Sequence, residues 1–369
     1  ADGYVGYIKT KSLKNQKKEK TSRDFTEPVY SDMTEDHSIN MAWHNVTNAA
    51  ANNAVQQVLA STSGLTTIAP TWFSLADTEG NISSIADADY VNYAHTAGLE
   101  VWAVFRDFHG GTNSYDETYE TLRYTSKRAK LEDQVVAAAV AAGVDGINLD
   151  FELISSKCGV HYVQLVRELS VKCHQNNLVF SVDNYVPQSY NSHYDLKEQG
   201  IVADYVVIMA YDEHTEGSYE AGSVASISYL QDGIEKTLKK VSADKVIAGI
   251  PFFTRLWFET AKSPEQLSEE AGTEAASYPN KVSSKALGME EAAQSVVNAG
   301  ATAQWDEKTQ QNYAKWSADG GTYRIWLEDA QSLEAKLKVI QENKLAGVAE
   351  WSLGKEESSV WKLISQYVN

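Results

Sequence analysis

The chain has 369 residues, of which 43% are hydrophobic and 22% charged, the proportions of an ordinary globular protein. Lys and Arg total 32 and Asp and Glu total 50, so the formal net charge is −18. This negative charge argues against nucleic acid and anionic membranes as partners, because both would repel it. The longest uncharged apolar run, Val135–Val144, is too short to span a bilayer, so no membrane insertion is expected.

The first 37 residues differ from the rest in charge. Between Lys9 and Arg23, seven residues are basic and one, Glu19, is acidic. An alternating apolar stretch, Tyr4–Ile8, precedes this run. The favoured interpretation of residues 1–37 is a solvated tail or linker with a frayed strand in front. Alternatively, Gly3–Leu13 resembles the last strand of a bacterial Src-homology-3-like wall-binding domain.

From Ser38 onward, β-branched and aromatic runs alternate with helical patterns. Strands are predicted at Ile39–Trp43, Leu65–Pro70, Glu100–Phe105, Val144–Phe151, Leu178–Asp183, Asp204–Ala210, Lys245–Ile250 and Ala346–Trp351. Helices are predicted between them at Ala50–Ala60, Ala88–Gly98, Lys127–Gly143, His161–Gln175, Ile227–Lys240 and Ala330–Asn343. About eight repeats of strand and helix require parallel pairing with right-handed crossovers. We therefore predict an α/β fold, a (β/α)8 barrel over residues 38–369.

One interval, between Ile250 and Ala330, shows no simple strand–helix unit. Its predicted elements are a helix at Gly288–Ala299 and strands at Ala301–Asp306, Gln311–Trp316 and Thr322–Leu327, with a turn at Asp319-Gly320-Gly321. We interpret the interval, at about 253–328, as a small α+β insertion after the seventh strand. It would stand on the rim where barrel loops form the site.

The two cysteines, Cys158 and Cys173, are too few for a disulfide framework. The helix predicted between them has a rise of about 22 Å. That separation is far beyond the reach of a disulfide, so both are expected to be reduced thiols.

The segment Val144–Glu152 carries the strongest functional signal. Alternate side chains of a strand share a face, which gives an outward set of Ile147, Leu149 and Phe151 and an inward set of Asn148, Asp150 and Glu152. Glu152 comes last, at the C-terminal mouth where barrel enzymes keep their chemistry. Two neighbouring carboxylates stabilise a proton on one of them, which suits a general acid that must stay protonated near neutral pH. The pattern fits glycoside hydrolysis.

Two other interpretations of this segment stay open. One is a purely structural row of polar residues, although barrel interiors are ordinarily filled by branched apolar residues. The other is a Mg²⁺ site formed by Asp145, Asp150 and Glu152. Asp145 lies on the opposite face of the strand, and no spacing of His or Cys indicates zinc. We expect neither a metal nor a cofactor.

The segment Asp145–Glu152 resembles the signature Asp-Gly-x-Asp-x-Asp-x-Glu of glycoside hydrolase family 18. Further matches follow in the family's order, at Met209-Ala210-Tyr211-Asp212, at Gly249–Arg255 and at Gly347–Trp351. Together the resemblance covers about Ser38 to Asn369, and its nearest branch is the bacterial spore- and wall-associated members.

The resemblance implies roles for three residues. Glu152 matches the general acid and base, Asp150 the carboxylate that holds the substrate's acetamido N–H, and Tyr211 the hydroxyl that steadies the acetamido oxygen. In this family the substrate's own acetamido oxygen attacks the anomeric carbon. Asn148 departs from the pattern, since many chitinases carry a second Asp there. The resemblance implies that wall-active branches tolerate Asn here, so we expect an active enzyme; loss of activity is the alternative. The substitution leaves open the pH optimum and how Asp150 shuttles its charge.

Several aromatic and polar residues stand at or just past predicted strand ends, where they would contact sugars. The predicted substrate-binding residues are Asn148, Asp212, Trp351, Trp72, Trp43, Tyr185 and Arg255. Trp351 also matches the family's tryptophan beneath the sugar. Arg255 has an alternative role as an ion-pair partner within the insertion.

The resemblance implies a retaining glycosidase acting on β-1,4-linked N-acetylglucosamine polymers, such as peptidoglycan, spore cortex or chitin. The alternative is a non-catalytic carbohydrate-binding protein of the same family; the presence of Glu152 favours the enzyme. We expect a monomer that is extracellular and associated with cell wall or spore. The chain begins at Ala1, with no initiator Met and no signal peptide, which fits a processed or excised chain.

Overall fold

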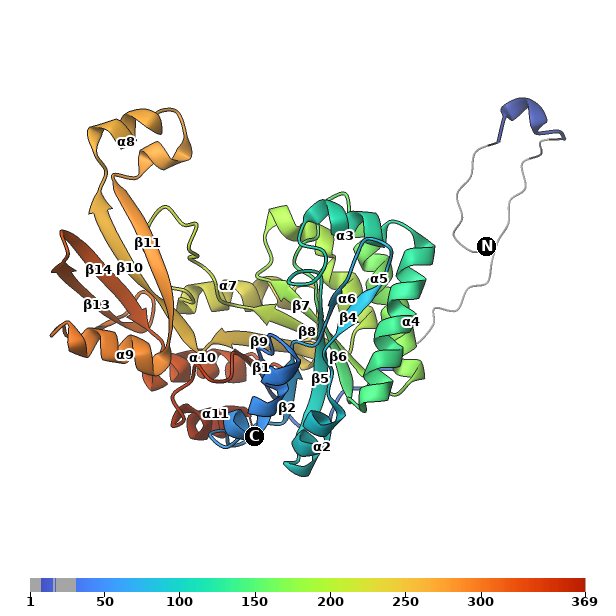
Figure 1. Ribbon diagram of the computed structural model, residues 1–369, viewed down its shortest axis with the longest axis horizontal. Coiled ribbons are helices and arrows are strands. Elements are labelled where there is room, and N and C mark those ends of the chain that lie inside the picture. Colours follow the sequence, from blue (N-terminus) through green and yellow to red (C-terminus); the bar gives the residue numbers. More distant parts are fainter. Residues whose placement is uncertain (1–7, 16, 18–30, 369) are drawn as a thin grey trace.

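The structure is a computed structural model that describes residues 8–15, 17 and 31–368 (Figure 1). The expected strand at Tyr4–Ile8, except for Ile8, and the part of the basic run beyond Lys17 lie outside these residues. Within them, no helix is both long and apolar enough to cross a membrane.

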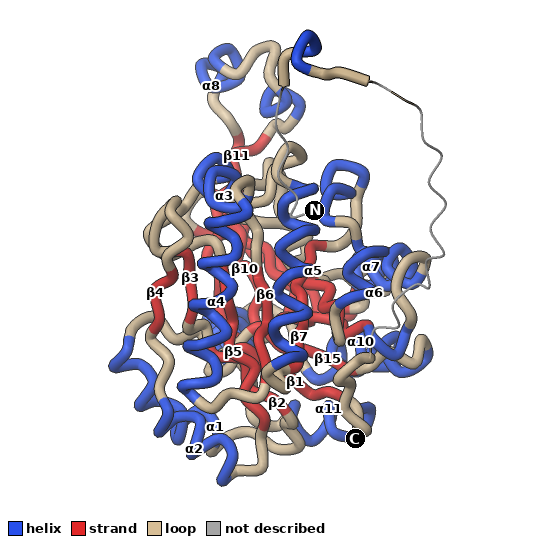
Figure 2. The backbone as a smooth tube through the Cα atoms, turned by 90° about the vertical axis from the view of Figure 1, so that its right-hand side faces the viewer, coloured by secondary structure: helices blue, strands red, loops and turns tan. Residues whose placement is uncertain are grey.

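Eight parallel strands form the barrel at the centre of the molecule (Figures 1 and 2). They are β1 (Ile39–His44), β2 (Thr67–Pro70), β5 (Glu100–Arg106), β6 (Gly146–Asp150), β7 (Val179–Tyr185), β8 (Tyr205–Met209), β9 (Val246–Pro251) and β15 (Gly347–Trp351). Pairing of β2 with β5 closes the ring. The predicted (β/α)8 barrel is confirmed.

Helices surround the barrel, as Figure 2 shows for α4 and α5. They are α1 (Val55–Leu59), α2 (Ala88–Thr96), α3 (Tyr115–Leu122), α4 (Thr125–Ala142), α5 (Gly159–Gln175), α6 (Leu196–Val202), α7 (Ile227–Leu238), α10 (Ala330–Glu342) and α11 (Val360–Val368). The short helices α3, α6 and α11 and the hairpin β3 (Phe73–Leu75) with β4 (Ile82–Ser84) were not predicted. The predicted helix at Ala50–Ala60 is mostly a 3-10 helix, Ala49–Ala54, followed by α1.

Side chains of the barrel strands alternate between two hydrophobic clusters, as predicted for the strand of Ile147. Ile147, Leu149 and Phe151 pack outward into one large cluster between strands and helices. A second cluster fills the barrel interior and includes Trp43, Trp102, Val104, Tyr205 and Ala349. Cys158 and Cys173 are both free and buried, in agreement with the expectation.

Between β9 and α10 the chain forms a second, antiparallel sheet, seen at the left of Figure 1. Its strands are β10 (Phe253–Ala261), β11 (Asn280–Gly288), β12 (Gln304–Asp306), β13 (Gln311–Ala318) and β14 (Gly321–Leu327), with α8 (Pro264–Glu269) and α9 (Met289–Asn298). The long pair β10–β11 and α8 were not predicted. The predicted turn between β13 and β14 is present, and Asp319 and Gly320 adopt the left-handed backbone that such a turn requires.

The segment just before β1 lies against the N-terminal ends of the barrel strands, opposite the mouth. The backbone N–H of Met33 donates to Asp204 at 2.7 Å, and that of Glu35 donates to the Tyr205 hydroxyl at 2.7 Å. The carboxylate of Asp32 pairs with Lys245 at 2.6 Å.

Candidate active site

The inward row of β6 leads up to the mouth of the barrel, where Asp150 and Glu152 line a pocket. Asn148 lies deeper and does not line it, which corrects its predicted role as a substrate-binding residue. Asn148 is fully buried, and its amide is held on both sides. The indole N–H of Trp43 donates to its Oδ1 at 3.0 Å, and its Nδ2 donates to Ser181 Oγ at 2.9 Å and to Asp183 Oδ1 at 2.7 Å. Since Trp43 can only donate, these bonds fix which end of the amide faces which partner.

Glu152 lies just past the end of β6 and is held by residues at the ends of the two neighbouring strands, β5 and β7. Asp107, directly after β5, accepts the backbone N–H of Glu152 at 2.8 Å and that of Leu153 at 3.0 Å. The hydroxyl of Tyr185 donates to Glu152 Oε2. Burial raises the pKa of Glu152 and the charge of Asp212 raises it further, while the Tyr185 hydrogen bond lowers it. A carboxyl with a raised pKa at an open mouth can serve as a general acid.

Asp150 sits one step deeper than Glu152 and has little help in carrying a charge. Its Oδ1 is buried without a hydrogen-bond partner. Burial raises the pKa of Asp150 well above its ordinary value, the charges of Glu152 and Asp183 add to that rise, and Arg106 opposes it. Asp150 as a whole is 8% exposed and lines the pocket described next, where it can accept a ligand N–H.

A pocket of about 160 Å³ opens over these residues. It is lined by Trp43, Phe108, Asp150, Glu152, Asp183, Tyr185, Met209, Tyr211, Asp212 and Trp351. The ring centroid of Trp43 lies 6.0 Å from that of Trp351 and 6.4 Å from that of Tyr211. Only 2% of Trp43 is exposed, so its ring is part of the barrel interior, which corrects its predicted role as a surface that stacks on a sugar. Burial keeps the pKa of Tyr211 well above its usual value, so its hydroxyl retains the proton it could donate.

Asp212 and Arg255 are placed differently from each other. Asp212 follows β8 with a left-handed backbone, φ 57°, and lines the pocket. Arg255, on β10, donates to Ser284 Oγ at 3.1 Å and does not line the pocket. Its charge nevertheless lowers the pKa of Asp212, which burial raises.

Trp72 is a correction to the predicted set. Only 2% of its surface is exposed, and it belongs to the core between the barrel and the helices. Its indole N–H donates to Asn52 Oδ1 at 2.8 Å, and its ring packs edge-on to Tyr90 at 4.9 Å. A ring with so little exposed surface cannot stack on a sugar.

Three charged residues of the site were not singled out from the sequence: Arg106, Asp107 and Asp183. Arg106 ends β5, Asp107 follows it, and Asp183 lies two residues before the end of β7; Asp107 and Asp183 are buried. A charged residue at such a position is the signal that could have found them, because barrel chemistry is concentrated there.

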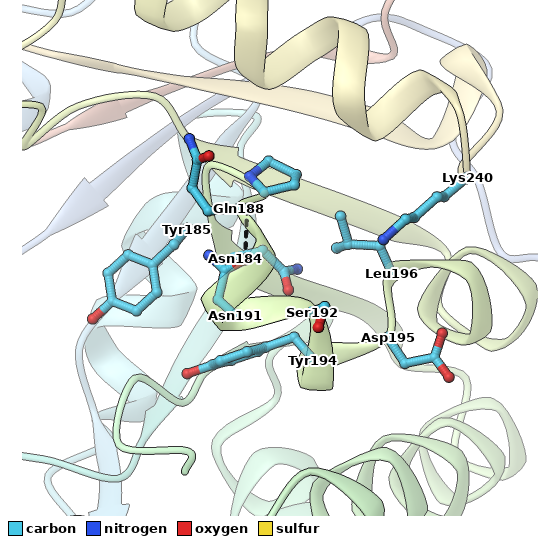
Figure 3. A pocket seen from close by; sticks show the side chains of 10 residues that line it. Asn184, Tyr185, Gln188, Asn191, Ser192, Tyr194, Asp195, Leu196 and Lys240 are labelled. Carbon is cyan, nitrogen blue, oxygen red and sulfur yellow. Dashed lines mark hydrogen bonds between the residues drawn. The ribbon is translucent and has the colours of Figure 1, made fainter. Parts of the chain in front are cut away.

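A second, smaller pocket lies beside Tyr185 (Figure 3). Its volume of about 20 Å³ suits a water molecule and excludes a sugar ring. Figure 3 shows the Tyr185 ring directed away from Leu196 and Lys240, two residues of this pocket, so its hydroxyl belongs to the mouth.

The residues considered for a metal site do not converge. Asp145 lies at the opposite end of β6 from the mouth, where its Oδ2 accepts the Val101 backbone N–H at 2.8 Å and contacts His95 at 2.8 Å. Across the part of the chain that the structure describes, no three His, Cys, Asp or Glu residues are grouped to hold a metal ion.

Comparisons with known proteins place this site in a family. The model of glycosyl hydrolases family 18 matches residues 42–356. The "Uncharacterized glycosylase YvbX" of Bacillus subtilis (strain 168) is 26% identical over 295 residues, 77% of this chain and 80% of that protein. The cortical fragment-lytic enzyme of the same organism is 27% identical over 256 residues, 66% of this chain but only 54% of that protein.

Solved structures share the fold. The spore cortex-lytic enzyme SleL of Bacillus megaterium QM B1551 has a TM-score of 0.73 at 20% identity, covering 90% of this chain and 74% of that chain. A chitinase of Cycas revoluta in complex with (GlcNAc)4 has a TM-score of 0.72 at 19% identity, covering 90% of this chain and 100% of that chain. Because the family model covers the barrel from β1 to past β15, the protein belongs to glycosyl hydrolase family 18.

Proposed function

We propose that this protein is a retaining glycosidase that cleaves β-1,4-linked N-acetylglucosamine polymers, with the sugar's own acetamido group as the nucleophile. The observation that carries the proposal is Glu152, a carboxyl of raised pKa in an open pocket that Asp150 and Tyr211 also line.

Glu152 gives its proton to the glycosidic oxygen as the bond from that oxygen to the anomeric carbon breaks. The acetamido oxygen attacks the anomeric carbon from the other face and forms an oxazolinium ion. Water then attacks the same carbon, the oxazolinium C–O bond breaks, and Glu152 takes up the proton of that water. Two displacements at one carbon retain its configuration; family 18 is named as substrate-assisted in general accounts of glycosidases.

Asp150 and Tyr211 act on the acetamido group. As an anion, Asp150 accepts the acetamido N–H and offsets the positive charge that develops on the ring. The Tyr211 hydroxyl donates to the acetamido oxygen and orients it for attack. Trp351 supplies an apolar face beneath the sugar, and Asp212 accepts from sugar hydroxyls.

For the substrate we favour bacterial wall material, peptidoglycan or spore cortex, over chitin. The similarity to a cortical fragment-lytic enzyme and to SleL supports this choice, and it implies a protein outside the cell that acts on wall or spore as a monomer. Parallel digestion of cortex fragments and chitin oligomers, followed by mass spectrometry, should give the higher kcat/KM on cortex fragments. Faster cleavage of chitin would reverse the choice of substrate and leave the chemistry intact.

Glu152→Gln tests the chemistry. It removes the proton donor and keeps the side chain's shape, so turnover should fall by about 10⁴-fold while Tm and oligosaccharide binding persist. Proton NMR of the first products should show the β-anomer. Appreciable residual turnover, or an α-product, would contradict the proposal. A lectin would instead bind without turnover and show no preference for an oxazoline-like inhibitor over plain oligosaccharide.

A further inference from the structure

Three charged side chains lie next to one another on consecutive strands of the barrel. Arg106 on β5 is in register with Asp150 on β6. The register of β6 with β7 pairs Asn148 with Ser181, so two residues further on Asp150 stands beside Asp183. Neighbouring strands are about 4.8 Å apart, so the two carboxyl groups are neighbours on the inner face of the barrel, and the charge of Asp183 acts on Asp150.

Asp183 is buried and only half satisfied. Its exposed surface is 2%, and its Oδ1 accepts from Asn148. Its Oδ2 has no hydrogen-bond partner, and neither has Oδ1 of Asp150. Two unpartnered carboxylate oxygens in adjacent buried positions are costly when both groups are charged, and one proton relieves the cost for both.

The charges around the pair favour retention of that proton. The charged and titratable groups that act on Asp150 and Asp183 are Arg106 from β5, Asp107 after it, Glu152 after β6, Tyr162 from α5, Tyr185 from β7 and Tyr211 after β8. Only Arg106 is a cation. Burial, together with the charge of Glu152, raises the pKa of Asp183 to about 8, and the hydrogen bond from Asn148 lowers it.

We propose that Asp183 is a positioning residue for this reaction, the second acid of the site, which holds one proton in exchange with Asp150. In the free enzyme the pair carries one proton and one negative charge. When the acetamido N–H reaches Asp150, the proton moves from Asp150 to Asp183 Oδ2, so that Asp150 accepts the N–H as an anion. The proton returns when the product leaves.

Asn148 has two effects on the exchange of a proton between Asp150 and Asp183: it cannot take the proton itself, and its amide orients Asp183. An amide cannot take up the proton of Asp150, so the inward position of β6 below Asp150 offers it no acid. The Trp43 N–H fixes Asn148 Oδ1, which turns Nδ2 toward Asp183 and occupies Asp183 Oδ1. Oδ2 is thereby left as the oxygen for the proton. This inference rests on the proposed glycosidase activity and names the residue that sets its charge state.

Asp183→Asn is the first test, because it keeps the shape but cannot exchange a proton. If activity requires both the Glu152 proton and the shared proton, the alkaline limb of log kcat/KM against pH has a limiting slope of about −2 in the native enzyme. In the variant the slope should be about −1, and kcat should fall roughly 10- to 100-fold with KM little changed. The matched control is Ser181→Ala, which removes the other acceptor of Asn148 and no acid; it should keep the native slope.

The double variant Asn148→Asp/Asp183→Asn moves the second acid to the strand of Asp150. It should recover kcat to within about fivefold of the native value and restore the slope of −2. A native pH profile for Asp183→Asn would overturn the inference, as would a folded double variant no better than the single variant.

A measurement without substrate separates this inference from the proposed function. An acid with a raised folded-state pKa stabilises the fold at low pH and loses that contribution as the pH rises from its unfolded value toward about 8. The Tm of the native protein relative to that of Asp183→Asn should therefore fall between about pH 4 and pH 8. That result in a protein without glycosidase activity would leave the proton-holding pair standing and reject the function; a pH-independent difference would overturn the pair.

Discussion

Two buried acidic clusters in this molecule differ in how far their oxygens are paired. Glu328 stands where the insertion returns to the barrel, and Lys336 contacts its oxygens at 3.0 and 2.9 Å. Gln311 and Ser332 donate to the same carboxylate at 2.7 and 2.8 Å. Asp150 and Asp183, equally enclosed, each keep an oxygen without a partner. The paired acid holds two parts of the fold together, and the unpaired acids keep capacity for a proton and a ligand.

A buried carboxylate oxygen without a hydrogen-bond partner indicates a reactive acid only when the residue also lies at the pocket. Both oxygens of Glu350 on β15 are buried without partners, and burial raises its pKa well above the ordinary value. Its neighbour Trp351 lines the pocket, whereas Glu350 does not. The difference lies in strand alternation, which sends one side chain to the mouth and the next to the outer layer.

The largest effect that tests this comparison is expected at Lys336. Lys336→Met leaves Glu328 buried without its cation, which should reduce the free energy of unfolding by about 3–5 kcal/mol. Urea denaturation monitored by tryptophan fluorescence measures this loss, and the double variant with Glu328→Gln should regain most of it. Asp183→Asn should cost far less stability. Similar losses in the two variants would show that both clusters are structural.

Asp107 tests whether a fully used acid at the mouth also matters for chemistry. Asp107→Ala removes the acceptor for the N–H groups of Glu152 and Leu153, so Glu152 should shift and kcat/KM should fall about 100-fold. Thr118→Val, the control, removes one donor to Asp107 at 3.1 Å and leaves those two bonds in place. Initial rates well below the Tm of each variant measure the effect; equal rates for both variants would remove Asp107 from the positioning of Glu152.

Tyr185 should give the smallest effect, a displaced pH profile. Its hydrogen bond lowers the pKa of Glu152, so Tyr185→Phe should raise that pKa and move the alkaline limb of kcat/KM to higher pH. The activity lost at high pH would then be retained over a wider range. Tyr190→Phe, at a residue 77% exposed, is the control and should leave the limb in place. A shift to lower pH would contradict the assignment of Glu152 as the acid.

The barrel and the row on β6 could be predicted from the sequence because both follow from local periodicity. The alternation of Ile147, Leu149 and Phe151 with polar neighbours needed no knowledge of other strands. The strand β10 escaped prediction because several of its residues, such as Arg255 and Leu256, are only half buried, which weakens the apolar alternation.

The errors and omissions at the site concern contacts between strands. Trp72 and Trp351 both follow predicted strands, yet only the packing of Tyr90 against Trp72 separates a core ring from a sugar platform. Asp183 becomes meaningful only once β7 is known to lie beside β6 in a particular register. Periodicity places residues on faces, and register decides which of them meet.

The join between the barrel and the insertion has a consequence for how a polysaccharide enters. Phe252 alone separates β9 from β10; it is fully buried, and its N–H donates to Trp351 O at 2.8 Å. Further along β10, the Trp257 indole N–H donates to Gly222 O at 2.9 Å. A wall fastened at both points cannot swing like a lid, so we expect glycan chains to thread along a fixed edge and to leave at a pace set by their own dissociation.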